Sequence, residues 1–210
     1  MVRLKLWDIG CYKKAGCKIK YFAPLFILVF AFAAFLQSNE DRYLFWKPGL
    51  KLKWSDFHGH VKSEDDASAS ASYIGFFHKI KKSAHADSIL LDTRAFFNKA
   101  KSWVKVPSVN PDLLAHEQLH FDLAELFSRK FRRAVEQINI REISLNRIVD
   151  STYKYYANKG DSMHFLYDIE TNHGLNRESQ YKWNEKVKEE LLQLANNQSP
   201  FLKICIKPRK

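Results

Sequence analysis

The stretch Leu114-Ala115-His116-Glu117-Gln118-Leu119-His120-Phe121-Asp122 places two imidazoles and a carboxylate about one helical turn apart. On a helix, His116 and His120 would lie on one face, about 6 Å apart along the axis, so that two neutral ring nitrogens can bind one Zn²⁺. Glu117 would lie beside them, where a carboxylate can accept a proton from a water molecule that the metal has made acidic. This H-E-x-x-H spacing predicts a zinc site with an adjacent general base.

The residues around this motif favour a long helix over residues 110–138. Pro111 stands where proline is typical of a first helical turn, and apolar side chains recur at helical spacing at Leu119, Leu123, Leu126, Phe127 and Phe131. A partly exposed amphipathic helix would explain the same stripe, with His116 and His120 as ordinary residues of its polar face. The sequence alone leaves that alternative open.

Residues 1–38 have the outline of an export signal. Residues 1–20 carry six basic side chains against the single acid Asp8, and residues 21–36 are uncharged and almost entirely apolar. Since such a run spans about 24 Å as a helix, short of the roughly 30 Å hydrocarbon core, a cleaved signal peptide is favoured, with Ala31-Phe32-Ala33 as an A-x-A site. A signal anchor that holds the protein to the membrane through residues 21–36 is the alternative. In both cases residues 39–210 are expected outside the cytoplasm, in the periplasm, the cell envelope or the medium.

The remaining charge gives no strong pointer to a partner. Residues 1–38 hold six of the 34 basic and one of the 23 acidic side chains, so the formal charge falls from +11 to about +6 without them. A basic cluster at Arg129, Lys130, Arg132 and Arg133 suits either an anionic surface or a solvated helix face. The solvated face is favoured, and no nucleic-acid partner is expected.

Residues 39–210 are enough for one domain with its own core. Alternating or β-rich segments predict strands over residues 50–54, 73–80 and 88–97, and residues 63–71 are expected to form a loop. Apolar spacing predicts two more helices, over residues 145–165 and 176–196. The layout is therefore α+β, with N-terminal antiparallel strands packed on the motif helix and a helical C-terminal half.

A catalytic zinc site usually has three protein ligands, and the motif helix does not supply the third. Glu125 would lie about 180° around the helix from His116, and positions 123 and 126, where an extended motif would continue, are both leucine. The third ligand must therefore come from another part of the chain.

The best source is the stretch from residue 166 to residue 174, where Asp, Glu, Thr and His precede a glycine that can turn the chain. We expect His173 to be the third ligand, with Asp168 and Glu170 as the alternatives. The carboxylate that is not a ligand can orient a ligand imidazole. Spacing does not decide between ligand and bystander for the other histidines, which are His58, His60, His78, His85 and His164.

Two motifs occur together in this chain, His116-Glu117-x-x-His120 and Tyr167-Asp168-x-x-Thr171-x-His173-Gly174. They are preceded by Leu52-x-Trp54-x-Asp56-Phe57-x-Gly59 and by an Ala- and Ser-rich segment that ends in Tyr73-Ile74-Gly75. In this combination the chain resembles a bacterial family of secreted zinc-dependent proteases that is classed as a domain of unknown function. The resemblance covers roughly residues 50–183.

This resemblance implies an exported, single-domain zinc hydrolase with His116 and His120 as ligands and Glu117 as catalytic base; protease is the activity assumed for the family. We therefore expect a zincin-like domain that uses Zn²⁺ to hydrolyse a protein or peptide substrate, with His173 as third ligand and Tyr167 as donor to the oxyanion. The alternative is a non-catalytic zinc-binding envelope protein. Such a protein would need the imidazoles but not the Glu117 carboxylate.

Overall fold

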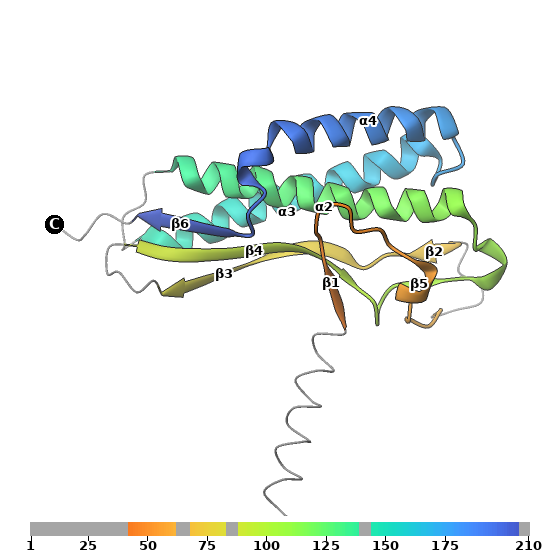
Figure 1. The fold of residues 1–210 in the computed structure, drawn as a ribbon, viewed down its shortest axis with the longest axis horizontal. Coiled ribbons are helices and arrows are strands. Elements are labelled where there is room, and N and C mark those ends of the chain that lie inside the picture. The colour runs from red at the N-terminus through yellow and green to blue at the C-terminus, as the bar shows by residue number, and fades with distance from the viewer. Residues whose placement is uncertain (1–41, 62–67, 83–87, 139–143, 206–210) are drawn as a thin grey trace, which may run out of the picture. The chain divides into compact units, whose positions relative to one another are not determined.

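The computed structural model describes residues 42–61, 68–82, 88–138 and 144–205 (Figure 1), which belong to one unit, residues 40–210. The expected export signal, with the apolar run 21–36, lies outside the described residues. Among the helices that are described, none has the length and apolar character needed to cross a membrane.

The main sheet is built around β4 (Ser88–Asn98), the longest strand described. One edge of β4 pairs along its length with β3 (Ile74–Lys82), in antiparallel register with Phe77 opposite Arg94. The other edge is shared by two short strands, β1 (Tyr43–Phe45) at the Asn98 end and β6 (Phe201–Cys205) at the Ser88 end. Both pairings are antiparallel, so the sheet is antiparallel throughout and the predicted strands 73–80 and 88–97 are confirmed.

A second, two-stranded sheet pairs β2 (Ser70–Ala71) with β5 (Trp103–Val104). The expected loop over residues 63–71 therefore ends in a short strand, while its residues 62–67 lie outside the described part of the chain. A backbone hydrogen bond from Lys105 N to Ala69 O, at 2.9 Å, extends this pairing on one side.

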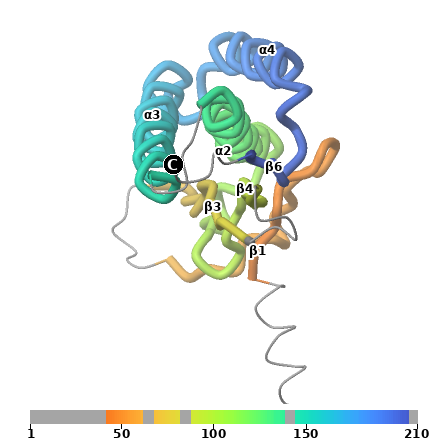
Figure 2. The backbone as a smooth tube through the Cα atoms, turned by 90° about the vertical axis from the view of Figure 1, so that its left-hand side faces the viewer, coloured from red at the N-terminus to blue at the C-terminus, as the bar shows by residue number. Residues whose placement is uncertain are grey.

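Three helices cover the main sheet. The motif helix α2 (Pro111–Gln137) lies directly on the sheet, α3 (Leu145–Thr171) runs beside it, and α4 (Arg177–Gln193) packs on α2 from the side away from the strands (Figure 2). The helices predicted over 110–138, 145–165 and 176–196 are confirmed, although α3 extends to Thr171. The α+β layout is also confirmed, with antiparallel strands before the helices, although β6 follows α4 and returns to the sheet.

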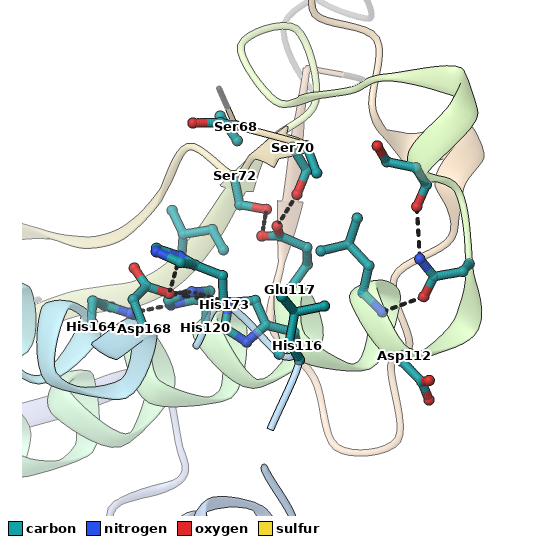
Figure 3. A pocket seen from close by; sticks show the side chains of 18 of the residues that line it. Ser68, Ser70, Ser72, Asp112, His116, Glu117, His120, His164, Asp168 and His173 are labelled. Carbon is teal, nitrogen blue, oxygen red and sulfur yellow. Dashed lines mark hydrogen bonds and ion pairs between the residues drawn. The ribbon is translucent and has the colours of Figure 1, made fainter. Parts of the chain in front are cut away.

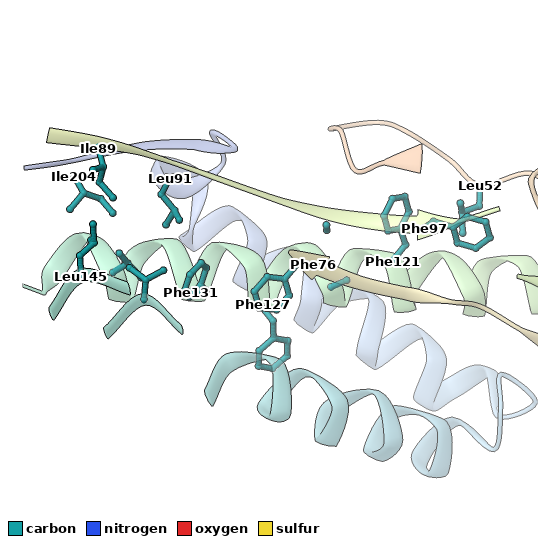
Figure 4. Packing of buried hydrophobic residues seen from close by; sticks show 14 residues of the cluster. Leu52, Phe76, Ile89, Leu91, Phe97, Phe121, Phe127, Phe131, Leu145 and Ile204 are labelled. Atoms are coloured by element: carbon teal, nitrogen blue, oxygen red, sulfur yellow. The ribbon is translucent and has the colours of Figure 1, made fainter. Parts of the chain in front are cut away.

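Burial of α2 on two sides explains why its apolar stripe is so wide. One core fills the space between α2 and the sheet and includes Phe97, Phe121 and Phe131, none of which is exposed (Figure 4). A second core joins α2 to α3 and α4 through Leu123, Tyr167, Trp183 and other apolar residues. The motif helix is therefore the centre of the domain, and its polar residues are held between two packed faces.

One prediction made from local patterns is wrong and another holds only in part. Residues 50–54 form no strand, because the backbone N–H of Leu52 donates to the Gln118 side chain at 2.7 Å and a 3₁₀ turn, Trp54–Asp56, follows. In the basic cluster Arg133 is exposed, as expected of a solvated face, but Arg129 and Arg132 are buried and both pair with Glu125.

Candidate metal centre and cleft

Helix α2 places the motif residues near its N-terminal end. The helix begins where the side chain of Asn110 accepts a hydrogen bond from Leu113 N at 2.8 Å, with Pro111 in the first turn. His116 and Glu117 are almost completely buried, with 3% and 5% of their surfaces exposed. As the sequence predicts, His120 lies on the same face as His116, and their Nε2 atoms are 3.2 Å apart.

Helix α3 brings two more polar side chains to this pair (Figure 3). Asp168 Oδ1 lies 3.1 Å from His116 Nε2 and 2.9 Å from His120 Nε2. His164, one turn earlier on α3, contacts the opposite nitrogen of His120, with 2.9 Å between the two Nδ1 atoms. Thus two residues one turn apart on α3 face two residues one turn apart on α2.

The hydrogen bonds of His116 suit a proton on Nδ1 and a lone pair on Nε2. Its Nδ1 lies 3.3 Å from Gln180 Oε1, and an amide oxygen only accepts, so in this arrangement His116 donates from Nδ1. The orientation of the Gln180 amide is set by its own donation to Asn184 at 2.9 Å and by the hydroxyl of Tyr167, which donates to Oε1 at 2.7 Å. A neutral His116 therefore turns an unprotonated Nε2 toward Asp168.

A hydrogen bond donated by His120 to His164 would give His120 the same arrangement of proton and lone pair. Burial, reinforced by the neighbouring His120, lowers the pKa of His164 to about 3, so its ring is neutral at ordinary pH. When its Nδ1 accepts the hydrogen bond from His120 Nδ1, the lone pair of His120 also lies on Nε2. A hydrogen-bond partner behind each ligand imidazole is typical of metal sites.

In these tautomers three lone-pair-bearing atoms converge in one place. Ligands at 2.0–2.1 Å from a tetrahedral ion lie roughly 3.3 Å from one another, close to the observed separations. Within the described residues, His116, His120 and Asp168 are the group that can hold a metal ion, and their donor set fits Zn²⁺.

Glu117 lies next to this group but is held by a different element. Its two carboxylate oxygens accept hydrogen bonds from the hydroxyls of Ser70 and Ser72 (Figure 3). These residues, the two histidines and Asp168 line a cleft of about 1140 Å³, bounded further along by Asn110, Leu113 and Leu175. The carboxylate is therefore fixed at the wall of a cleft large enough to admit a substrate.

His173, expected as the third ligand, lies at the edge of the cleft with 74% of its side chain exposed. Its Nδ1 is 3.8 Å from Asp168 Oδ1, and it is not part of the converging group. The reason is that α3 continues to Thr171 and the chain then turns through three left-handed residues, Asn172, His173 and Gly174. The geometry favours Asp168, one of the two alternatives, over His173.

Gly174 lets this turn pack against the motif helix. Its φ is +82°, and a Cβ atom at this position would lie 2.9 Å from the Cβ of His116. No other residue type could adopt this conformation here and leave His116 in place. The glycine of the motif is thus needed for close approach of the chain to His116.

Two other expected site residues face away from the cleft. The Tyr167 ring stacks on the imidazole of His116 at 4.6 Å, and its hydroxyl, in the core, contacts Gln180 and the backbone oxygen of His116. Tyr167 therefore supports His116 from behind and is not placed to donate to an oxyanion. Glu170 accepts a hydrogen bond from Trp183 Nε1 at 2.8 Å and so turns toward α4.

Sequence reasoning missed three residues of the site, namely Ser70, Ser72 and Gln180, and left the role of His164 undecided. A usable signal existed for His164, because His164 and Asp168 have the i, i+4 spacing that places two side chains on one face of a helix. Ser70 and Ser72 have the alternate spacing of one face of a strand. Gln180 had no signal, since its role depends on how α4 packs.

Comparisons of the chain with protein-family models, with curated proteins and with solved structures give no match. What this site can do therefore follows from the chemistry of its own residues. Two imidazole nitrogens and a carboxylate oxygen converge, a second carboxylate is buried beside them, and a cleft leads to both.

Proposed function

We propose that this chain is a zincin-like zinc hydrolase that acts on protein or peptide substrates, with His116, His120 and Asp168 as ligands and Glu117 as general base. The observation that carries the proposal is the convergence of two imidazole Nε2 atoms and one carboxylate oxygen within 3.2 Å. The basic and apolar leader of residues 1–38 supports the further proposal that the domain works after export.

The ligand set and the cleft both favour this assignment. Two imidazoles and one carboxylate suit Zn²⁺, whereas Ca²⁺ and Mg²⁺ prefer sites built from oxygen atoms. Three protein ligands leave a fourth position, as in catalytic zinc sites. The cleft volume of about 1140 Å³ exceeds the range of about 300–1,000 Å³ that is common for small-molecule sites, which favours a segment of a polymer as substrate.

Bound zinc supplies a Lewis acid, which lowers the pKa of water to about 7. Glu117, one residue from a ligand and facing the same cleft, is placed to take the proton of the attacking water and to return it to the leaving amine. Small residues, namely Ser68, Ala69 and Ala71, also line the cleft and leave room for the backbone of a peptide substrate to approach. Each of these roles belongs to a residue on the cleft wall.

The experiment that tests the proposal is Glu117→Gln in the purified protein. We expect the variant to keep about one zinc per chain by elemental analysis, because Glu117 is not a ligand, and to lose about 10²-fold or more in hydrolysis, because the amide cannot accept the proton. Hydrolysis is measured on a library of proteome-derived peptides by mass spectrometry, which also reads out the cleavage specificity.

The wild type and Glu117→Gln together also test the alternative, a non-catalytic zinc-binding protein. A non-catalytic zinc-binding protein would cleave no peptide in the library in either form, although it would bind zinc. Peptide cleavage that Glu117→Gln retains in full would remove Glu117 as the base, and a protein purified without chelator that holds no stoichiometric metal would remove the zinc centre.

A further prediction concerns His164, which we propose orients His120. Replacing His164 by phenylalanine removes the acceptor behind His120 Nδ1, so we expect zinc affinity to fall by about 10- to 100-fold. His164→Asn keeps an acceptor oxygen near the position of Nδ1 and should lose less. Competition with a chromophoric chelator measures both affinities, and equal affinities for the phenylalanine variant and the wild type would contradict the role.

A further inference from the structure

The Glu117 carboxylate is held by neutral groups only. Its side chain is buried, and within the described part of the chain it forms no ion pair. Instead one oxygen accepts from the Ser70 hydroxyl and the other from the Ser72 hydroxyl. The second buried glutamate of α2, Glu125, is paired in contrast with two guanidinium groups. The two glutamates are therefore stabilised in different ways.

The two serines reach Glu117 because they alternate along an extended segment. Residues two apart in an extended segment face the same side, so Ser70 and Ser72 both reach Glu117, while the backbone of Ala71 between them pairs with that of Trp103. The segment is anchored on both sides of the serines, through Lys105 N to Ala69 O and through Tyr73 N to Ser102 Oγ, each at 2.9 Å. Both hydroxyls are thus presented from a fixed backbone.

This arrangement fixes the carboxylate without blocking it. Each carboxylate oxygen has two lone-pair sites, and the serines take one from each oxygen, so one site on each remains for a water molecule. Because both donors are neutral, they set the direction of the carboxylate without cancelling its charge. A free glutamate side chain would sample several rotamers, and a misplacement of about 1 Å can cost 10²-fold in rate.

We propose that Ser70 and Ser72 are positioning residues that hold Glu117 in the orientation required of the general base. This inference rests on the proposed hydrolase function and adds the element of the fold that prepares the base. The role is indirect, because neither serine needs to touch the substrate in order to act.

The test is a double-mutant cycle between the serine pair and Glu117 in the full protein. For Ser70→Ala/Ser72→Ala we expect kcat to fall by about 10-fold or more on a peptide that the wild type cleaves, with KM within about twofold and zinc affinity unchanged. In the Glu117→Gln background, removal of the serines should have little further effect on kcat, since the group that they position is already lost. Ser162→Ala, which removes a hydroxyl bonded within α3 outside the cleft, should behave as the wild type.

A second readout does not depend on activity. Loss of both hydroxyls leaves a buried carboxylate without donors, so Ser70→Ala/Ser72→Ala should lower the thermal midpoint by about 4 °C or more in the wild-type background. In a Glu117→Ala background the same change should shift the midpoint by less than half as much.

The outcomes separate this inference from the function on which it rests. Unchanged kcat in the serine variant, together with loss of hydrolysis in Glu117→Gln, would overturn the positioning role and leave the hydrolase intact. A serine effect of equal size in both backgrounds would also overturn it, because the serines would then act independently of Glu117. Full hydrolysis by Glu117→Gln would remove Glu117 as the base and with it the positioning role, whereas no cleavage by the wild type would overturn the proposed function itself.

Discussion

Asp168→Asn is expected to weaken zinc binding by more than about 100-fold. Asp168 Oδ1 lies within 3.1 Å of both ligand nitrogens, so the substitution exchanges the anionic ligand for a neutral amide. Loss of a hydrogen-bond partner behind a ligand costs about 10- to 100-fold, and loss of a ligand should cost more. Elemental analysis and chelator competition on the purified variant measure the change, and hydrolysis should fall with the zinc content.

Two neighbouring residues of the same motif provide matched controls. His173→Ala and Glu170→Gln each remove a side chain that was a candidate ligand, but the first is 74% exposed and the second faces Trp183. We expect both variants to keep about one zinc per chain. If His173→Ala loses zinc and Asp168→Asn keeps it, the third ligand is His173, and the turn after α3 must then close over the site when metal binds.

Arg132→Met is expected to lower the free energy of unfolding by about 3–5 kcal/mol. Only 1% of the Arg132 surface is exposed, and its guanidinium donates to Glu125, to Ser128 and to the backbone oxygens of Thr93 and Asn197. The substitution therefore leaves two carbonyl groups without this donor and leaves Glu125, whose pKa burial already raises, with Arg129 as its remaining cationic partner. Urea denaturation followed by circular dichroism measures the change.

The next residue along α2 is the control. Arg133 is exposed, so Arg133→Met makes the same chemical change without a buried partner and should stay within about 0.5 kcal/mol of the wild type. Equal losses in the two variants would show that the buried guanidinium adds nothing specific. A loss confined to Arg132→Met would show that the buried guanidinium, which donates to Thr93 O and Asn197 O, stabilises the packing of α2 on β4 and on the segment after α4.

The elements that the sequence predicted are those with their own periodicity. Helix α2 and strands β3 and β4 carry apolar patterns long enough to be recognised, and their bounds match within a few residues. The short strands β1, β2, β5 and β6 were missed because two to five residues carry no period of their own. Their strand conformation depends on partners that are distant in the sequence. The strand predicted over residues 50–54 is absent because of another partner distant in the sequence: the Gln118 side chain accepts the hydrogen bond from the Leu52 N–H.

At the site, the sequence identified the motif residues and the segment that faces them, but not how that segment is oriented. Treating residues 166–174 as a loop made His173, beside the glycine, the natural ligand. In the structure Asp168 still belongs to α3, where helical phase directs it at His116 and His120 and turns Tyr167 into the core. A single helix end, set by the left-handed residues 172–174 and not by any apolar pattern, therefore decides which side chain faces the pair.

The sharing of one edge of β4 by β1 and β6 has a consequence for how the chain is made. A nascent chain that has emerged through β4 and α2 can pair β3 with β4, yet the half of the β4 edge from Ser88 to Asp92 must wait for Phe201–Cys205, which are synthesised after α2, α3 and α4. Until then an apolar edge with Ile89 and Leu91 stays open to pairing with another chain. Pairing of β6 with β4 therefore covers this part of the edge and ends the interval in which the edge can pair with another newly made chain.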